Sequence, residues 1–152
     1  MTDPATVVLS NPQGLYDPTG NGYSHVAQVP AGSCLLFIAG QGGESAEGVL
    51  SANFQDQARQ ALANLELALA SGGASLGQVC KLTLLIVDHC QERLAEWVAE
   101  ADRAWGTAMK PTCTLIPVPP LALDGISLAI DAVALAPATS QGWLSVAPRV
   151  VK

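Results

Sequence analysis

The side chains best suited to covalent or metal chemistry are few, and their spacing excludes the common metal sites. They are Cys34, Cys80, Cys90, Cys113, His25 and His89. No two cysteines form a CxxC pair, and no cysteines and histidines share the spacing of a zinc site. The sequence therefore predicts free thiols and no metal or other cofactor, with Cys34 and Cys80 buried as small apolar groups.

Cys113 is the candidate catalytic residue, and two interpretations of it stay open. A cysteine attacks as the thiolate, whose pKa must be lowered by a nearby histidine, cation or helix N-terminus. The sequence does not show whether His25 or His89 reaches Cys113. The thiol is either a nucleophile or ligand contact on a cleft floor, or a small buried group on a strand. Thr114 adds a neighbouring hydroxyl, but alternation along a strand lets only one of the two side chains face the cleft.

Composition indicates a single folded domain that shares apolar surface with copies of itself. Of the 152 residues, 49% are hydrophobic and only 13% are charged, which suits one sizeable core and not a disordered chain. Soluble monomers rarely expose large apolar patches, so we expect an oligomer. The domain is expected to cover residues 1–137, followed by a loosely attached tail over residues 138–152.

Charge and hydropathy disfavour several classes of partner. The formal net charge is −6, and the seven basic residues are scattered apart from Arg149 and Lys152, whereas nucleic-acid binding needs clustered cations. No apolar run approaches the roughly 20 residues that span a bilayer. The first residues include Asp3 and Pro4 rather than a basic and then apolar leader. We therefore expect no nucleic-acid or membrane partner and a cytoplasmic location.

Apolar periodicity places two helices among the strands. One helix is expected to begin after Ser51 as its N-cap and to end at Gly72 and Gly73, and the other carries a core stripe that includes Trp97 and Trp105. The first two strands are expected to pair across a turn at residues 30–33. The strands are expected at residues 25–29, 34–39, 79–87, 112–118 and 126–135, with residues 6–9 as a candidate addition.

This order, β-β-α-β-α-β-β, predicts an α+β fold in which one sheet carries both helices on the same face. The continuous apolar run at residues 34–39 is typical of a strand covered on both faces. Because the helices cover only one face, we expect the other face to pack against further copies of the chain.

Several segments resemble the Rid/YjgF family in their order and spacing. The likeness covers roughly residues 11–136, and no single motif decides it. The segments are residues 22–25 (GYSH), 38–41 (IAGQ), 57–69 (QARQALANLELAL), 73–75 (GAS), 111–117 (PTCTLIP) and 130–134 (IDAVA).

The resemblance implies a chorismate-mutase-like α+β fold and a homotrimer with ligand clefts at the subunit junctions. It also implies hydrolysis of reactive enamines and imines to ketones and ammonia. In such deaminases an arginine after a Pro-Ala pair holds the substrate carboxylate through two parallel hydrogen bonds. A glutamate on the last strand positions or activates water, an early tyrosine packs against the ligand, and a Gly-Gln turn adds polar backbone contacts.

Some of these positions match and give candidate binding residues. Tyr23 matches the tyrosine, where it either stacks on a ligand or anchors a turn. Gly40 and Gln41 match the turn, where they either present backbone N–H groups to an anion or simply end a strand.

The two charged positions of the deaminase site do not match. The arginine position holds Cys113 and the glutamate position holds Ala129. Asp131 is expected on the same strand face as Ala129. In the family, however, this acid occupies a position distinct from that of the glutamate. Asp131 is therefore either a substrate contact or a surface or interface residue. We therefore expect little or no deaminase activity on enamines derived from amino acids.

Several functions remain open, and the sequence does not settle whether the protein is an enzyme at all. The first is a Rid-type trimer that binds a small metabolite, either as a binding module alone or to assist an imine or enamine reaction such as cyclisation or condensation. The second is an enamine/imine deaminase, of the 2-iminobutanoate or 2-iminopropanoate type, whose clamp comes from other residues. The third is a hydrolase that depends on Cys113, and the last is the endoribonuclease activity sometimes attributed to the family, which the acidic charge disfavours.

Overall fold

The computed structural model describes residues 6–137 and confirms the predicted α+β order. The candidate strand at residues 6–9 is present as the short strand β1, while the tail predicted over residues 138–152 lies outside the described residues. The elements are β1 (Val8–Ser10), η1 (Thr19–Asn21), β2 (Val26–Gln28), β3 (Cys34–Gln41), α1 (Phe54–Ser71), η2 (Leu76–Gln78), β4 (Val79–Val87), α2 (Gln91–Trp105), β5 (Thr112–Val118) and β6 (Leu128–Ala136).

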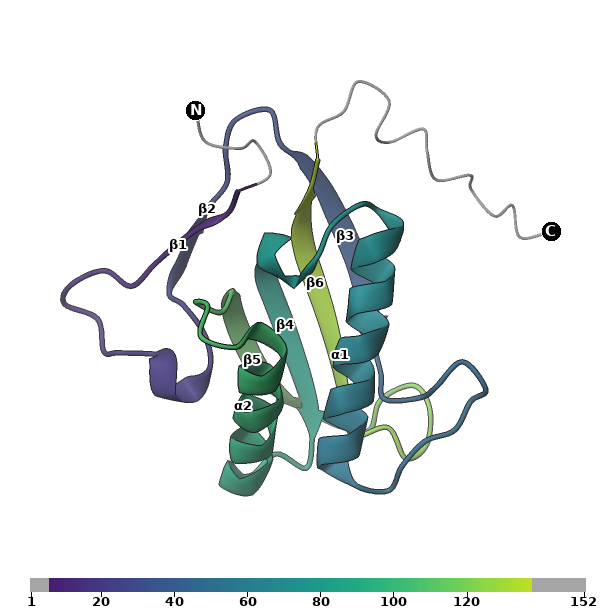
Figure 1. Cartoon of the computed structure of the whole chain (residues 1–152). Helices are drawn as coiled ribbons and strands as arrows, with labels where there is room; N and C mark the ends of the chain where they lie inside the picture. Colours follow the sequence, from purple (N-terminus) through teal and green to yellow (C-terminus); the bar gives the residue numbers. More distant parts are fainter. Residues whose placement is uncertain (1–5, 138–152) are drawn as a thin grey trace.

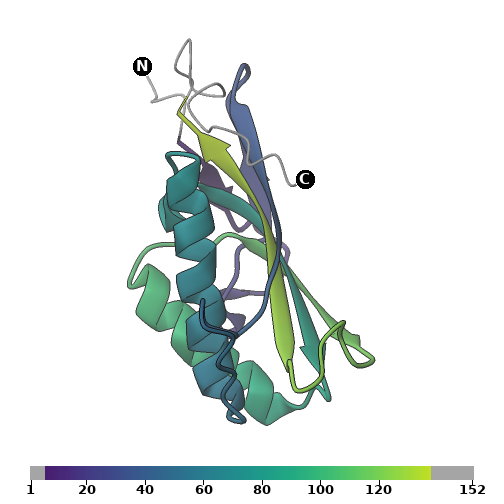
Figure 2. The same ribbon diagram turned by 90° about the vertical axis from the view of Figure 1, so that its right-hand side faces the viewer.

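The main sheet has the strand order β3-β6-β4-β5, so β3 and β5 are its two edges. β6 pairs antiparallel with β3 and β4, and β4 pairs parallel with β5 through the crossover helix α2. Figure 1 shows α1 and α2 in front of the sheet, and the view turned by 90° in Figure 2 shows both on the same face. The predicted one-sided arrangement of the helices is therefore confirmed.

The core lies between the helices and the covered face of the sheet. Trp97 and Trp105 of α2 are buried there, as the apolar stripe predicts, with alternate residues of β4 and β6. Cys80 is buried as expected, but Cys34 is only half-buried at the start of edge strand β3. The α1 residues that complete this core are Phe54, Ala58, Ala61, Leu62, Leu65 and Leu69.

The start of α1 differs from the prediction by two residues. Asn53, and not Ser51, is the N-cap, and its side chain accepts a hydrogen bond from the Asp56 backbone N–H. Ser51 supports this cap, since its hydroxyl accepts from the Asn53 N–H at 3.1 Å and donates to the Asp56 carboxylate. Asn is a favoured N-cap residue because its amide oxygen reaches the otherwise unpaired N–H groups of the first helical turn.

A buried carboxylate joins the two helices. Glu100 of α2 is 1% exposed and binds Arg59 of α1, with 2.7 Å between Arg59 Nη2 and Glu100 Oε1. Arg103 Nε lies 2.8 Å from the other oxygen, and Gln55 also donates to Glu100. These three donors satisfy the charge and hold the pKa of the Glu100 carboxyl at about 2, with the Arg59 hydrogen bond as the largest cause.

The predicted pairing of the first two strands is wrong. β2 pairs antiparallel with β1 in a separate two-stranded sheet, and not with β3. The reason is that Ser24, just before β2, bridges to Thr112 at the start of β5. This bridge fixes the segment at the β5 edge, three strands away from β3.

The face of the sheet opposite the helices is open in the single chain. The prediction that residues 34–39 are covered on both faces does not hold here, because β3 alternates between partly buried and exposed residues. Leu35 and Phe37 of β3 and Ile116 of β5 are exposed large apolar side chains, and Phe37 is 77% exposed. Such a surface is unusual on a soluble monomer.

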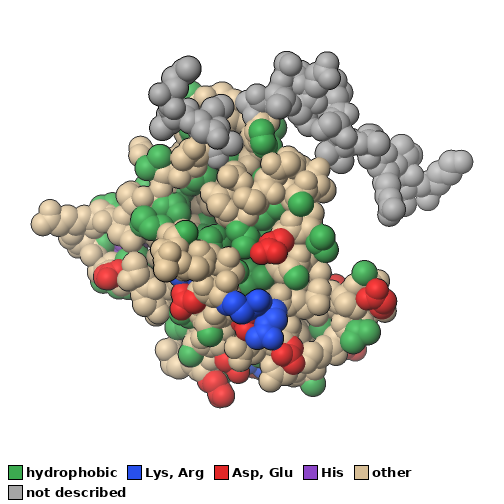
Figure 3. Space-filling view, in the orientation of Figure 1, with side chains coloured by type: hydrophobic (Ala, Val, Ile, Leu, Met, Phe, Trp, Pro, Cys, Tyr) green, Lys and Arg blue, Asp and Glu red, His purple; other side chains and the backbone are tan. Residues whose placement is uncertain are grey.

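The helix-bearing face carries no broad basic surface. In Figure 3, which views this face, Lys and Arg side chains gather in one small group beside acidic side chains. No helix within residues 6–137 is both long and apolar enough to cross a bilayer. Within the same residues no cluster of histidine, cysteine and acidic side chains is arranged to hold a metal ion.

Candidate functional site

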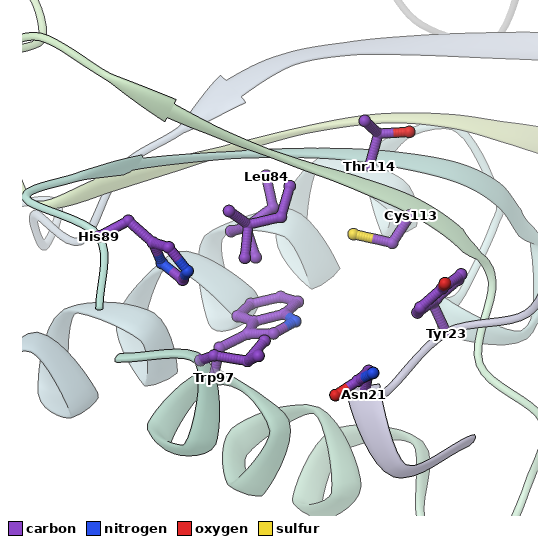
Figure 4. A pocket seen from close by; sticks show the side chains of 9 residues that line it. Asn21, Tyr23, Leu84, His89, Trp97, Cys113 and Thr114 are labelled. Atoms are coloured by element: carbon purple, nitrogen blue, oxygen red, sulfur yellow. The ribbon is translucent and has the colours of Figure 1, made fainter. Parts of the chain in front are cut away.

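A cavity of about 390 Å³ opens at the β5 edge, between α2 and the covered face of the sheet. Its walls come from α2, β4, β5, the turn after β4 and the segment before β2. Figure 4 shows Trp97 and His89 on one side of the space and Cys113 and Tyr23 on the other. The lining residues are Asn21, Tyr23, Leu84, His89, Leu94, Trp97, Cys113, Thr114 and Leu115.

The segment at residues 21–24 is fixed against both α2 and β5, which positions Asn21 and Tyr23. Gly22 has a φ of +77° and ends the η1 turn, and a Cβ there would lie 3.4 Å from Val98 of α2. The buried Ser24 donates its backbone N–H to the Pro111 carbonyl at 3.2 Å, and its hydroxyl donates to the Lys110 carbonyl. This close packing holds the chain beside the cavity.

Tyr23 is held by a small aromatic cluster. Its hydroxyl forms a hydrogen bond with the Tyr16 hydroxyl, and its ring lies edge-on to His25 with 5.5 Å between centroids. His25 in turn lies edge-on to Tyr16, and its Nε2 contacts the Tyr16 carbonyl oxygen at 2.8 Å. The Tyr16 hydrogen bond, followed by burial, raises the pKa of Tyr23 to about 12. Tyr23 is therefore protonated near neutral pH and does not act there as a base.

Cys113 faces the cavity but carries a neutral thiol. Its register partner is Leu82 of β4, whose side chain is buried against the helices. Burial raises the pKa of Cys113 to about 11, while the nearby Lys81 lowers it only in part. Since the thiolate is the reactive form, this environment does not favour the nucleophile interpretation.

Thr114 and Cys113 both border the cavity, but their side chains lie on opposite sides of β5. The Thr114 hydroxyl accepts a hydrogen bond from Lys81 Nζ at 2.6 Å, and Figure 4 shows Thr114 pointing away from Cys113. This is the alternation expected of a strand. The Cys113 thiol therefore faces the cavity, whereas the Thr114 hydroxyl lies toward the open face of the sheet.

The remaining predicted site residues lie elsewhere in the single chain. Gly40 and Gln41 end β3, the edge strand opposite β5, and the Gln41 amide donates to the Ala39 carbonyl at 3.0 Å. A Cβ on Gly40 would lie 3.5 Å from the Ala129 Cβ. Asp131 of β6 is exposed beside Thr83 of β4, on the open face. Tyr23 and Cys113 thus lie at one edge of the sheet, and Gly40 and Ala129 lie toward the other.

Comparison with known proteins places the chain in a family. A family model described as Endoribonuclease L-PSP matches residues 17–136. The chain belongs to the Rid/YjgF family. It is similar to the Rid protein YyfB from Yersinia pestis, with a TM-score of 0.80 and 30% identity over 86% of this chain and 98% of that chain.

Two further solved structures resemble the chain less closely. E. coli TdcF, solved with bound serine, has a TM-score of 0.62 and 26% identity over 89% of this chain and 95% of that chain. Rv2704 from Mycobacterium tuberculosis has a TM-score of 0.58 and 24% identity over 86% of this chain and 100% of that chain, a likeness that shows the fold alone. No functionally curated protein matched the sequence.

Sequence reasoning missed three contributors to the cavity of this Rid protein. The sequence alone does not single out Asn21, leaves open whether His89 reaches Cys113, and places Trp97 in the core stripe only. Trp97 is indeed buried, at 2% exposed, but one side of its ring borders the cavity. The family-like GYSH segment at residues 22–25 pointed to this region as part of the site. That Asn21, the residue before it, also lines the cavity follows only from the way the segment packs on α2.

Proposed function

We propose that this Rid protein forms a homotrimer and binds a small metabolite in clefts between its subunits. We further propose that it assists imine or enamine chemistry, such as cyclisation or condensation, without the arginine and glutamate of the deaminases. The cavity at the β5 edge carries the proposal, because Tyr23 and Cys113 both line it. A volume of about 390 Å³ suits a small molecule.

The predicted site residues lie at two opposite edges of the sheet, and this separation supports a cleft that is shared between subunits. Tyr23 and Cys113 lie at the β5 edge, whereas Gly40 and Gln41 lie at the β3 edge of the same sheet. A neighbouring copy that brings its β3 edge beside β5 would unite the two sets. The exposed Leu35 and Phe37 on the open face provide the apolar surface that such copies would bury.

The cleft is suited to orienting a ligand more than to acid–base catalysis. Tyr23 and Cys113 hold their protons at neutral pH, and none of the lining residues is a carboxylate, which leaves His89 as the remaining side chain on the lining that can transfer a proton. Holding two reacting groups at the right distance accelerates a reaction without any charged side chain. The serine bound to the related TdcF supports a small metabolite as the ligand class.

The proposal is tested by separating binding from turnover. Thermal unfolding in the presence of a panel of carbonyl and imine metabolites should show saturable stabilisation by at least one of them. The Cys113→Trp variant fills the cavity and should abolish this stabilisation, whereas Cys90→Ser, at an exposed cysteine, should not. A cavity-filling variant that responds to the ligand as the parent does would rule out this cavity as the site.

An assay of ammonia release distinguishes the proposed function from that of a conventional enamine/imine deaminase. Freshly generated 2-aminoacrylate should release ammonia no faster with the protein than without it. Turnover at ordinary enzyme rates, about 1–1,000 per second, would show that other residues replace the missing clamp. A Cys113-dependent hydrolase requires a thiolate, which the raised pKa of Cys113 disfavours. The net charge of −6 disfavours RNA as the substrate.

We also propose a cytoplasmic location. All four cysteines are free, which is the usual state in a reducing compartment.

A further inference from the structure

We infer that Lys81 of each copy forms an ion pair with Asp131 of the neighbouring copy, so that every interface of the trimer holds one such pair. This inference rests on the proposed function, because it requires the trimer, and it assigns Asp131 to the subunit interface and not to the ligand. Its support comes from the charge content of the main sheet, the position of both residues on the open face and the direction of the Lys81 side chain.

The main sheet carries one positive and one negative side chain. β3 and β5 contain no charged residue, β4 contains only Lys81, and β6 contains only Asp131. Leu82, which follows Lys81, and Ile130 and Ala132, which flank Asp131, belong to the core against the helices. Because successive side chains of a strand alternate between its faces, Lys81 and Asp131 both lie on the open face. One charge of each sign per copy suits an interface that repeats between identical copies.

Apolar side chains lie beside the two charges on this face. Val133 is the register partner of Lys81, and Phe37 of β3 is the register partner of Val133 on its other side. Contact with another copy over these side chains would also remove Asp131 from water. The Asp131 carboxylate forms no hydrogen bond or ion pair within residues 6–137, and burying it without a cation is unfavourable. The cation that the main sheet of a neighbouring copy can supply is Lys81.

Thr114 holds Lys81 away from Asp131 of its own chain. Lys81 Nζ donates to Thr114 Oγ1 at 2.6 Å, which directs the ammonium toward the edge strand β5. Asp131 lies on β6, on the opposite side of β4, with Thr83 as its register partner. The ion pairs within residues 6–137 do not join Lys81 to Asp131. An ammonium has three N–H donors, so two remain for a carboxylate of another copy.

The proposed arrangement of the subunits brings the two charges together. In it the β3 edge of a neighbour lies beside β5, and β6 is the strand next to β3. Asp131 of the neighbouring copy is then one strand in from the edge that approaches Lys81. The contact joins two different patches, so the same pair recurs at all three interfaces of a closed ring. An apolar face alone allows several packings, whereas buried charges disfavour those that leave either charge unpaired.

Charge reversal tests the pair in the full-length protein. Lys81→Glu and Asp131→Lys each bring like charges together, so we expect sedimentation analysis to show half-assembly at a concentration at least about tenfold above that of the parent. The two changes combined restore opposite charges and should assemble within about threefold of the parent concentration. Glu66→Lys, at an exposed position of α1, should assemble as the parent does. Single reversals without effect, or a combined variant that stays dissociated, overturn the inference.

Mixing the two single variants separates a pair between subunits from a pair within one chain. In an equimolar mixture, the acid introduced at position 81 meets the lysine introduced at position 131, and the unchanged Lys81 meets the unchanged Asp131. A mixed trimer then has opposite charges at two of its three interfaces, whereas a trimer of either variant alone has none. We expect the mixture to assemble at a concentration at least about threefold below that of either variant. No gain on mixing, with recovery in the combined variant, would place the pair within one chain and overturn the inference.

The failure of this inference is distinguishable from failure of the proposed function. If the parent is a trimer that both single reversals leave intact, the ion pair is wrong and the shared cleft stands. If the parent is a monomer, the trimer and the ion pair fail together.

Discussion

Lys81 and Thr114 form a hydrogen bond between neighbouring strands, with 2.6 Å between Nζ and Oγ1. Cys113, the residue before Thr114, has its side chain on the other side of β5. The one cation that acts on Cys113 is therefore held toward the open face, and the cavity keeps an uncharged lining. In the proposed site a ligand therefore meets no cation from β5, whereas the resemblance to the deaminases implies an arginine at the position of Cys113.

Introducing that arginine should create affinity for carboxylates. In Cys113→Arg a guanidinium enters the cavity and can form two charge-assisted hydrogen bonds to an acid. We expect p-toluate to bind at least about tenfold more tightly than it does to the parent protein, since such bonds contribute about 1.5–3 kcal/mol. Cys113→Met adds bulk without charge and should not show this gain. Unchanged p-toluate affinity in a folded Cys113→Arg variant would contradict the assignment of Cys113 to the binding cavity.

The Cys113 thiol should react slowly at neutral pH. Because burial raises its pKa to about 11, only a small fraction is thiolate at pH 7.5. We expect iodoacetamide to label the exposed Cys90 first, as measured by peptide mass spectrometry with time. Below its pKa, the Cys113 rate should rise about tenfold per pH unit as the thiolate fraction grows. Labelling of Cys113 faster than free cysteine at pH 7.5 would instead support the nucleophile interpretation.

The pH dependence of stability should reflect Glu100. Its pKa is lowered from 4.5 to about 2 in the folded protein, so its contribution is full above about pH 5 and is lost as the pH falls toward 2. We expect Glu100→Gln to lower the free energy of unfolding at pH 7 by about 1–3 kcal/mol.

The difference between the parent and Glu100→Gln should shrink steadily between pH 5 and pH 2. Urea unfolding at one fixed protein concentration measures it and avoids effects of assembly. Glu66→Gln, at an exposed position of α1, should change stability little at any pH. A constant difference from pH 7 to pH 2 would show that the ionised carboxylate does not contribute.

Assembly should depend on the open face of the sheet. The Phe37 side chain is 77% exposed there, and Phe37→Glu would place a charge in the proposed interface, where it lacks a partner. We expect sedimentation analysis to give the mass of a trimer for the parent and a monomer for this variant. Leu67→Glu changes a residue of α1 that is 72% exposed and should remain trimeric. A monomeric parent protein would remove the shared cleft from the proposed function.

The sequence by itself determined the secondary structure and the family. Burial of one face of a helix or strand imposes an apolar period of 3.6 or 2 residues on the sequence. These patterns are local, and they located α1, α2 and the strands. The types of the residues at positions 113 and 129 are likewise read directly from the chain. These properties needed no knowledge of which elements lie side by side.

Only the tertiary structure decided where those residues meet. The bridge from Ser24 to Thr112 carried the segment with Tyr23 to the β5 edge and overturned the predicted pairing of β2 with β3. The same strand order separated Gly40 from Cys113 and brought His89 and Trp97, far from Tyr23 in sequence, to one cavity. Such contacts depend on long-range packing, which local periodicity does not encode, and so the chemistry of the site could not be derived from spacing alone.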